Sequence, residues 1–364
     1  MKIRFIHITI IGLMMNVTQT YAMPDFFKSK DSSFKRFSLS AGWLYAEPQG
    51  NRNSFNNSTA IKEGTVSAVG DVQIQSVIDA VDTSTIEGQK VKDNLIRLRD
   101  EAGLTELPSI LSGDARLFQL SNWTSANSGL KPDTVNTLGI MFNYHINDNV
   151  SLELKAGIPP KVDIQGFGQI NAPLNGSAVL PAGVDEIIGS PTIPLSKQIP
   201  ITDLSQGGKA AEARAWLPAV EVHYQFGKSG VNKFRPYIGA GIMYAYFNNL
   251  KMNGGIEQDL IRAGHMVQNI RNGQAAAALE GKTSTAKPFV KLETTDAIAP
   301  IATIGFTYDF TPNWFTVASI SYAKLNNKAK VYVNDSNTGD NLIYSSAKID
   351  IDPIISYAGI GYRF

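Results

Sequence analysis

Strict alternation of apolar residues with small or polar residues recurs in eight segments of this chain. In the clearest of them, residues 138–146, the even positions hold Leu, Ile, Phe, Tyr and Ile, whereas the odd positions hold Gly, Met, Asn and His. Successive side chains of a strand point to opposite faces, so this pattern predicts a β-strand with one apolar face. The other segments are 37–45, 150–158, 216–226, 234–247, 300–310, 314–322 and 354–364.

The spacing of these segments predicts three hairpins, joined by the short turns 147–149, 227–233 and 311–313. The other connections are long, at about 49–132, 166–211, 249–297 and 334–346. A tilted strand of about 9–11 residues crosses a bilayer, and bacterial barrels of one chain have an even number of strands. We therefore expect an all-β fold, an eight-stranded antiparallel transmembrane β-barrel with periplasmic short turns and long extracellular loops.

The first long connection also carries a helical pattern. Ser84 and Glu87 have the spacing of a capping box, and apolar residues then recur at helical intervals up to Ala102. We expect a short helix there, and a second one within 256–279. Strand-like stretches at 59–75 and 115–120 leave ten strands as an alternative to eight.

The N-terminus has the features of an export signal. Lys2 and Arg4 precede an apolar run, and Thr20 and Ala22 stand at positions −3 and −1 of a cleavage site. We expect a signal peptide over residues 1–22 and a mature barrel over 23–364. Without Lys2 and Arg4, the 33 basic residues fall to 31 against 32 acidic ones, so the composition favours no nucleic-acid partner.

The chain has no cysteine and no phosphate-binding loop or other common enzyme motif. A lipid-modifying barrel enzyme is one alternative, but His145 and His223 point inward at the periplasmic end and His265 lies in a loop. Asp350 and Asp352 are too few ligands for a metal site. We expect a non-enzymatic protein with no catalytic residues, metal or cofactor.

The final strand ends on Tyr362-Arg-Phe364, which resembles the signal that the barrel-assembly machinery reads in Gram-negative outer-membrane proteins. Together with 152–159 (LELKAGIP), 234–241 (FRPYIGAG) and 349–353 (IDIDP), this ending resembles the OmpW family. The resemblance implies a small barrel of the outer membrane with a narrow apolar interior, implicated in moving small hydrophobic molecules. The long connections here exceed what the family leads us to expect.

Eight strands leave room inside only for side chains or one small ligand, so the inward residues decide the function. In the periplasmic half we expect a polar plug, kept together because losing one partner of a buried ion pair costs about 3–5 kcal/mol. Its members are Arg36, Glu153, Lys155, Glu221, His223, Arg235, Asp309 and Arg363. In the outer half we expect an apolar lumen of Leu44, Leu217, Met243, Phe247, Ile301, Ile355 and Tyr357.

This arrangement favours passage of small hydrophobic solutes into the outer membrane, with sideways exit through the wall. Candidate weak points are the prolines 159, 160, 218, 300 and 353, because each removes a hydrogen-bond donor from a strand. Outer-membrane lipids and the assembly machinery are the other expected partners. Three alternatives stay open: an ion or proton path through the plug, a filled barrel without passage, and a surface receptor or adhesin that acts through its long loops.

Overall fold

A computed structural model describes residues 34–364, so the predicted signal peptide lies outside the described residues. Within that range, eight antiparallel strands close a barrel, because the last strand pairs with the first. In spatial order they are β1 (Phe37–Pro48), β9 (Val135–His145), β10 (Val150–Gly157), β15 (Ala219–Gln225), β16 (Phe234–Met252), β18 (Ala297–Asp309), β19 (Trp314–Ala323) and β22 (Pro353–Arg363). The predicted fold is confirmed, with eight barrel strands rather than ten.

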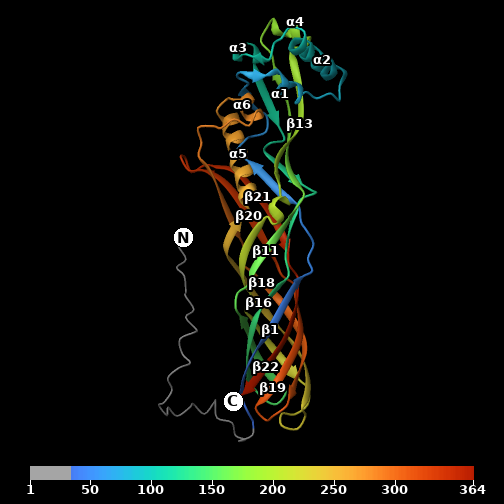
Figure 1. Cartoon of the computed structure of the whole chain (residues 1–364), viewed down its shortest axis with the longest axis vertical. Helices are drawn as coiled ribbons and strands as arrows, with labels where there is room; N and C mark the ends of the chain where they lie inside the picture. Colours follow the sequence, from blue (N-terminus) through green and yellow to red (C-terminus); the bar gives the residue numbers. More distant parts are fainter. Residues whose placement is uncertain (1–33) are drawn as a thin grey trace.

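The outer surface of the barrel is apolar. Along β15, buried and exposed residues alternate without exception, and Val220, Val222 and Tyr224 are on the exposed side. Ile242 on β16 and Ile298 on β18 are exposed as well. Such a surface fits lipid, and the C-terminus lies at the barrel end of the molecule (Figure 1).

The long connections fold into an extension beyond the other end of the barrel (Figure 1). The 19-residue strand β16 continues into it and pairs there with β14, which leads to β11 and β8. A second sheet runs in the order β17, β20, β21, β2, β7. The bounds are β2 (Phe55–Thr59), β7 (Asn122–Ser125), β8 (Gly129–Pro132), β11 (Lys161–Phe167), β14 (Ala211–Trp216), β17 (Pro288–Thr294), β20 (Asn326–Asp335) and β21 (Asn341–Asp350).

The part farthest from the barrel, here called the head, combines a four-stranded sheet with helices (Figure 1). The four strands of its sheet are β3 (Thr65–Ala68), β6 (Asp114–Phe118), β12 (Gln169–Val179) and β13 (Thr192–Asp203), and β4 (Val72–Gln73) pairs with β5 (Glu106–Leu107) in a separate sheet. The helices of the head are α1 (Ile74–Ile78), α2 (Ile86–Asp100), α3 (Ser109–Ser112), α4 (Val184–Ile188) and α6 (Ala275–Leu279). Helix α5 (Gly254–Arg271) packs along the second sheet, and the 3-10 turn η2 (Gln206–Gly208) lies beside β11. None of these described helices is both long and apolar enough to span a bilayer.

The regular structure of the connections differs from the expected loops in two ways. Most of the range 334–346 belongs to the β20–β21 hairpin rather than to a loop. Helix α2 is capped by Thr85, whose hydroxyl accepts from the Gly88 N–H at 3.1 Å, and not by Ser84. The reason is local: the Asp82 carboxylate accepts from the Ser84 N–H at 2.9 Å and holds it in the turn before the helix.

Candidate functional site

Four of the predicted plug residues form one buried ionic cluster inside the barrel. The Lys155 ammonium lies 2.5 Å from a Glu221 carboxylate oxygen and 3.7 Å from Glu153. It also donates to Thr303 at 2.8 Å and to Ser321 at 3.0 Å. The His223 ring lies 3.3 Å from Glu221, on the other side of that carboxylate. The lysine is thus surrounded by acceptors, as a buried cation requires.

A second cluster lies nearer the short turns. Arg363 is 2.6 Å from Asp309 and packs over the ring of Phe315, 4.3 Å from its centroid. Arg235 is buried and donates to the backbone carbonyl groups of Asp148 and Gly227 in the turns. The plug is therefore divided into two levels instead of one network.

Arg36 takes part in neither cluster. Its guanidinium lies 3.4 Å from the Tyr144 hydroxyl at the end of the barrel. Arg36 precedes β1, so its side chain does not reach the paired carboxylates inside the barrel.

Tyr357 lies lower in the barrel than the sequence pattern predicts. It packs with Met141, Tyr237, Phe315 and Val317, and its hydroxyl donates to Ser40 at 3.1 Å. The reason is the space left by two glycines. A methyl group at Gly139 would be 2.9 Å from the Tyr357 ring, and one at Gly359 would be 2.5 Å from its hydroxyl. Tyr357 thus belongs to the layer beside the plug and not to the apolar lumen.

Above the Lys155 cluster the interior becomes apolar and filled. Met243, Ile301 and Ile355 are 2%, 3% and 8% exposed, and Leu44 packs between this layer and the one around Tyr357. Alanines at positions 219, 299 and 323 complete the layer. These side chains form a buried apolar layer inside the barrel, here called the lumen floor (Met243, Ile301, Ile355).

Beyond the lumen floor, the barrel mouth and the extension enclose the throat cavity, with a volume of ≈ 90 Å³. Leu217 and Phe247, both predicted for the apolar lumen, line it. Much of its lining was not anticipated from the sequence, because it comes from β8, β11, β14, β17, β20, β21 and the residues that follow β21. Their apolar contributions include Leu130, Val162, Ile164, Ala213, Ala329, Ile349 and Ile351.

Glu212 is a charged residue at the rim of this cavity, in the extension. Its carboxylate lies 2.6 Å from Lys161 and 3.0 Å from Lys209. Hydrogen bonds from these two ammonium groups, Lys161 first, lower the pKa of Glu212 to about 2. The carboxylate therefore stays ionised and paired with the lysines, and does not supply an acidic group to the cavity.

The barrel wall is irregular beside the throat cavity. The pairing of β10 with β15 ends at Lys155 opposite Ala219 and resumes as β11 with β14 at Lys161 opposite Arg214. Between these two pairs, one strand advances by six residues and its partner by five, as at a β-bulge. We call residues 156–159 and 216–218 between these points the wall gap. Pro160 and Leu217 line the cavity at this gap.

Several known proteins resemble this chain. Residues 276–364, which include β18, β19 and β22, match the OmpW family. Over 240 residues the chain is 22% identical to outer membrane protein W of Vibrio cholerae, covering 66% of this chain and 79% of that protein. Two aligned solved structures are OprG from Pseudomonas aeruginosa (13% identity, TM-score 0.44, 92% of this chain and 99% of that one) and outer membrane protein W from E. coli (15%, 0.33, 91% and 98%).

The family match falls on strands that close the barrel described above, and the barrel surface is apolar where lipid surrounds it. Over residues 276–364 the chain is therefore similar to the OmpW family, and its barrel is one of the bacterial outer membrane, in contact with membrane lipids.

Proposed function

We propose that this barrel passes small hydrophobic molecules from the outside into the outer membrane, through the throat cavity and sideways through the wall gap. The observation that carries the proposal is the position of the cavity. It is apolar, and Pro160 and Leu217 at its side belong to or adjoin the wall gap. A solute in the throat cavity is thus separated from lipid by a strand pair whose ladder is interrupted.

The route straight down the barrel is unfavourable for an apolar solute. It leads past the lumen floor to Lys155, whose ammonium is 2.5 Å from Glu221. Displacing either partner would leave a buried charge without its counterion, which is strongly destabilising. Sideways exit only exchanges one apolar environment for another. This contrast argues against an ion or proton path as well, because the lumen floor offers no polar group to carry it.

The size of the cavity supports a small solute. A dry apolar cavity of about 150 Å³ binds benzene, whereas the throat cavity measures ≈ 90 Å³. Binding therefore requires the walls to move slightly. Leu217 and Phe247 are only partly buried, so these side chains are suited to such movement.

The lateral route is tested by closing the wall gap. Ile158 and Trp216 face each other across it when the register of Lys155 with Ala219 is continued, and the chain has no other cysteine. In I158C/W216C proteoliposomes, we expect oxidation to abolish transfer of the fluorescent apolar probe N-phenylnaphthylamine, and a reductant to restore it. Each single-cysteine variant is a control. Equal transfer in the oxidised and reduced double variant contradicts lateral exit.

The apolar throat is tested separately with L217D, and L217M serves as the matched control of similar volume. A carboxylate there must be desolvated whenever solute enters, so we expect L217D to lower transfer about 10-fold or more. L217M should transfer the probe at the normal rate. Normal transfer by a correctly assembled L217D protein contradicts a role for the throat cavity.

A surface receptor is the second candidate function, since the head is packed around buried side chains, including the fully buried Val91 and Leu95 of α2. Val69 donates a backbone hydrogen bond to Gly113 at 2.9 Å, so a short turn can replace residues 70–112 between β3 and β6. We expect this variant to keep probe transfer. Loss of binding to host cells or surfaces with transfer intact would support the receptor function beside transport.

Assembly is proposed to use the C-terminal strand. The rings of Tyr362 and Phe364 contact each other edge to face, 5.4 Å between centroids, and Phe364 is exposed at the barrel end. This surface fits recognition of the unfolded or nascent strand by the barrel-assembly machinery.

A further inference from the structure

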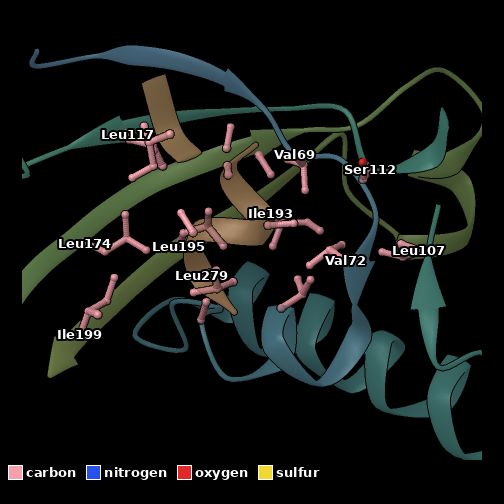
Figure 2. Close-up of a pocket in the computed structure, with 18 of the residues that line it drawn as sticks. Val69, Val72, Leu107, Ser112, Leu117, Leu174, Ile193, Leu195, Ile199 and Leu279 are labelled. Atoms are coloured by element: carbon pink, nitrogen blue, oxygen red, sulfur yellow. The ribbon is translucent and has the colours of Figure 1, made fainter. Parts of the chain in front are cut away.

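The head contains an apolar cavity of its own, with a volume of ≈ 70 Å³. Figure 2 shows Leu174, Ile193, Leu195 and Leu279 gathered around it, with strands of the head sheet on one side and helices on the other. The cavity is distinct from the throat cavity, because the two share no lining residue. We call it the head cavity.

The lining of the head cavity defines the chemistry of a ligand. Apart from Ser112, which lies at its edge (Figure 2), all lining residues are aliphatic, alanine or methionine. A water molecule needs several polar partners, and genuinely empty cavities are apolar. The space therefore suits a small hydrocarbon and not a polar or charged compound.

Helix α6 is built as a movable cover of this cavity. Four of its five residues are alanines, and Ala276 and Ala278 are buried against the cavity. Alanine buries little apolar surface, so packing holds this helix only weakly. Gly273 and Gly281 flank it with φ of +71° and +67°, a left-handed conformation suited to glycine hinges.

Two contacts hold α6 closed over the cavity. The Ala276 N–H donates to the Val69 carbonyl at 2.9 Å. The Glu280 carboxylate, at the end of α6, accepts from the Gln73 N–H at 2.7 Å. Both partners belong to the segment that leads into α1, so releasing them would detach α6 from that segment, while Asn269 of α5 still donates to the Lys282 carbonyl at 2.7 Å.

A second void of ≈ 50 Å³ lies behind the head cavity. Met266 of α5 lines both voids, as do Leu120, Ile199 and Ile270. Methionine is unbranched and changes its conformation easily. A turn of the Met266 side chain would join the two spaces and make room for a molecule larger than either void admits.

We propose that the head cavity is a second binding site for a small hydrocarbon, entered by displacement of α6. This site would take up its ligand outside the membrane, at the far end of the extension from the barrel (Figure 1). Binding there does not depend on transport through the barrel. The head would thus collect the same class of compound that the throat is proposed to transfer.

The test is a benzene titration of the full chain in lipid nanodiscs, followed by NMR of labelled methyl groups. We expect saturable shifts of Ile193, Leu195 and Leu279 in the head, recorded separately from Ile351 in the throat cavity. A178L fills the head cavity and should weaken benzene binding there about 10-fold or more, with no change at Ile351. A213L, which fills the throat cavity, is the matched control and should leave the head shifts unchanged.

L279A enlarges the head cavity and should bind benzene at least as tightly as the natural chain. This variant tests benzene binding in the head if A178L does not fold. E280A removes the acceptor of Gln73 and should speed both association and dissociation of benzene in the head, with little change in affinity. Head methyl groups that do not shift with benzene in either the natural chain or L279A overturn the proposal. Unchanged exchange rates in E280A overturn the role of α6 as the cover. Neither result bears on transfer through the wall gap.

Discussion

The strand β16 passes through two regions of opposite character. In the barrel, Ile242 is 59% exposed on the outer face and Arg235 is buried inside. A few residues further, in the extension, Leu250 lines the throat cavity and the Lys251 side chain is 74% exposed. One continuous strand thus has its apolar side outward in the barrel and inward in the extension.

The difference teaches that the surroundings, and not the strand, decide which face is apolar. In the bilayer the apolar side chains face lipid and the polar ones are paired inside the barrel. In water the apolar side chains form a core. The apolar face changes sides near the throat cavity, where the lipid-facing surface of the barrel meets the apolar core of the extension. That junction is a suitable point for a hydrophobic solute to leave one environment for the other.

The largest effect should follow from breaking the polar interior of the barrel. Glu221 and Glu153 are 0% and 4% exposed, so K155M leaves both buried carboxylates without the ammonium group that lies at 2.5 and 3.7 Å from them. We expect a loss of about 3 kcal/mol, the lower part of the usual range for an unpaired buried charge. Urea unfolding in detergent, followed by tryptophan fluorescence, measures it.

The triple variant K155M/E153Q/E221L separates the charge from the packing. It removes Lys155 together with both carboxylates, so no unpaired charge is left and the barrel should regain most of its stability. If the triple variant is less stable than K155M, the unpaired carboxylates are not the source of the effect.

A smaller effect should come from placing a lysine on each of two equally exposed apolar positions. Ile242 on the barrel and Val66 on the head are 59% and 55% exposed. I242K should cost about 2–4 kcal/mol because the charge meets lipid. V66K should change stability by less than about 0.5 kcal/mol because it meets water. Unfolding in lipid vesicles gives both values, and equal costs would contradict the contrast between barrel and extension.

The smallest effect should be a pH dependence confined to the extension. Asp335 accepts from the Lys287 N–H at 2.8 Å and the Asn337 N–H at 3.0 Å. These hydrogen bonds, that of Lys287 first, lower the pKa of the carboxyl below its usual range. The stability they supply is present above the unfolded pKa of about 3.9 and is lost as the pH falls through the lowered folded value.

Hydrogen exchange of the Lys287 and Asn337 amides, corrected for intrinsic rates, should therefore show faster opening as the pH falls from about 6 to about 3. D335N should lose this dependence. The barrel amides should exchange equally slowly at both pH values. A dependence that persists in D335N would assign the effect to another group.

Local alternation was sufficient to predict the barrel strands. In β10, for example, Leu152 and Leu154 are exposed to lipid, and Glu153 and Lys155 are buried inside, as the period of two requires. Two residues of the throat, Leu217 and Phe247, were also predicted. The others, such as Val162 and Ile351, lie in connections whose partners are distant in sequence, and no local pattern identifies such partners.

The sequence by itself determined the strands and their inward faces, because side-chain alternation is a local property of the backbone. Only the tertiary structure decided the levels within the barrel. In the structure Tyr357 lies beside the plug, next to Gly139 and Gly359, and the charged residues form two clusters. It also formed the throat and head cavities, since these depend on register, on strand tilt and on contacts between segments far apart in the chain.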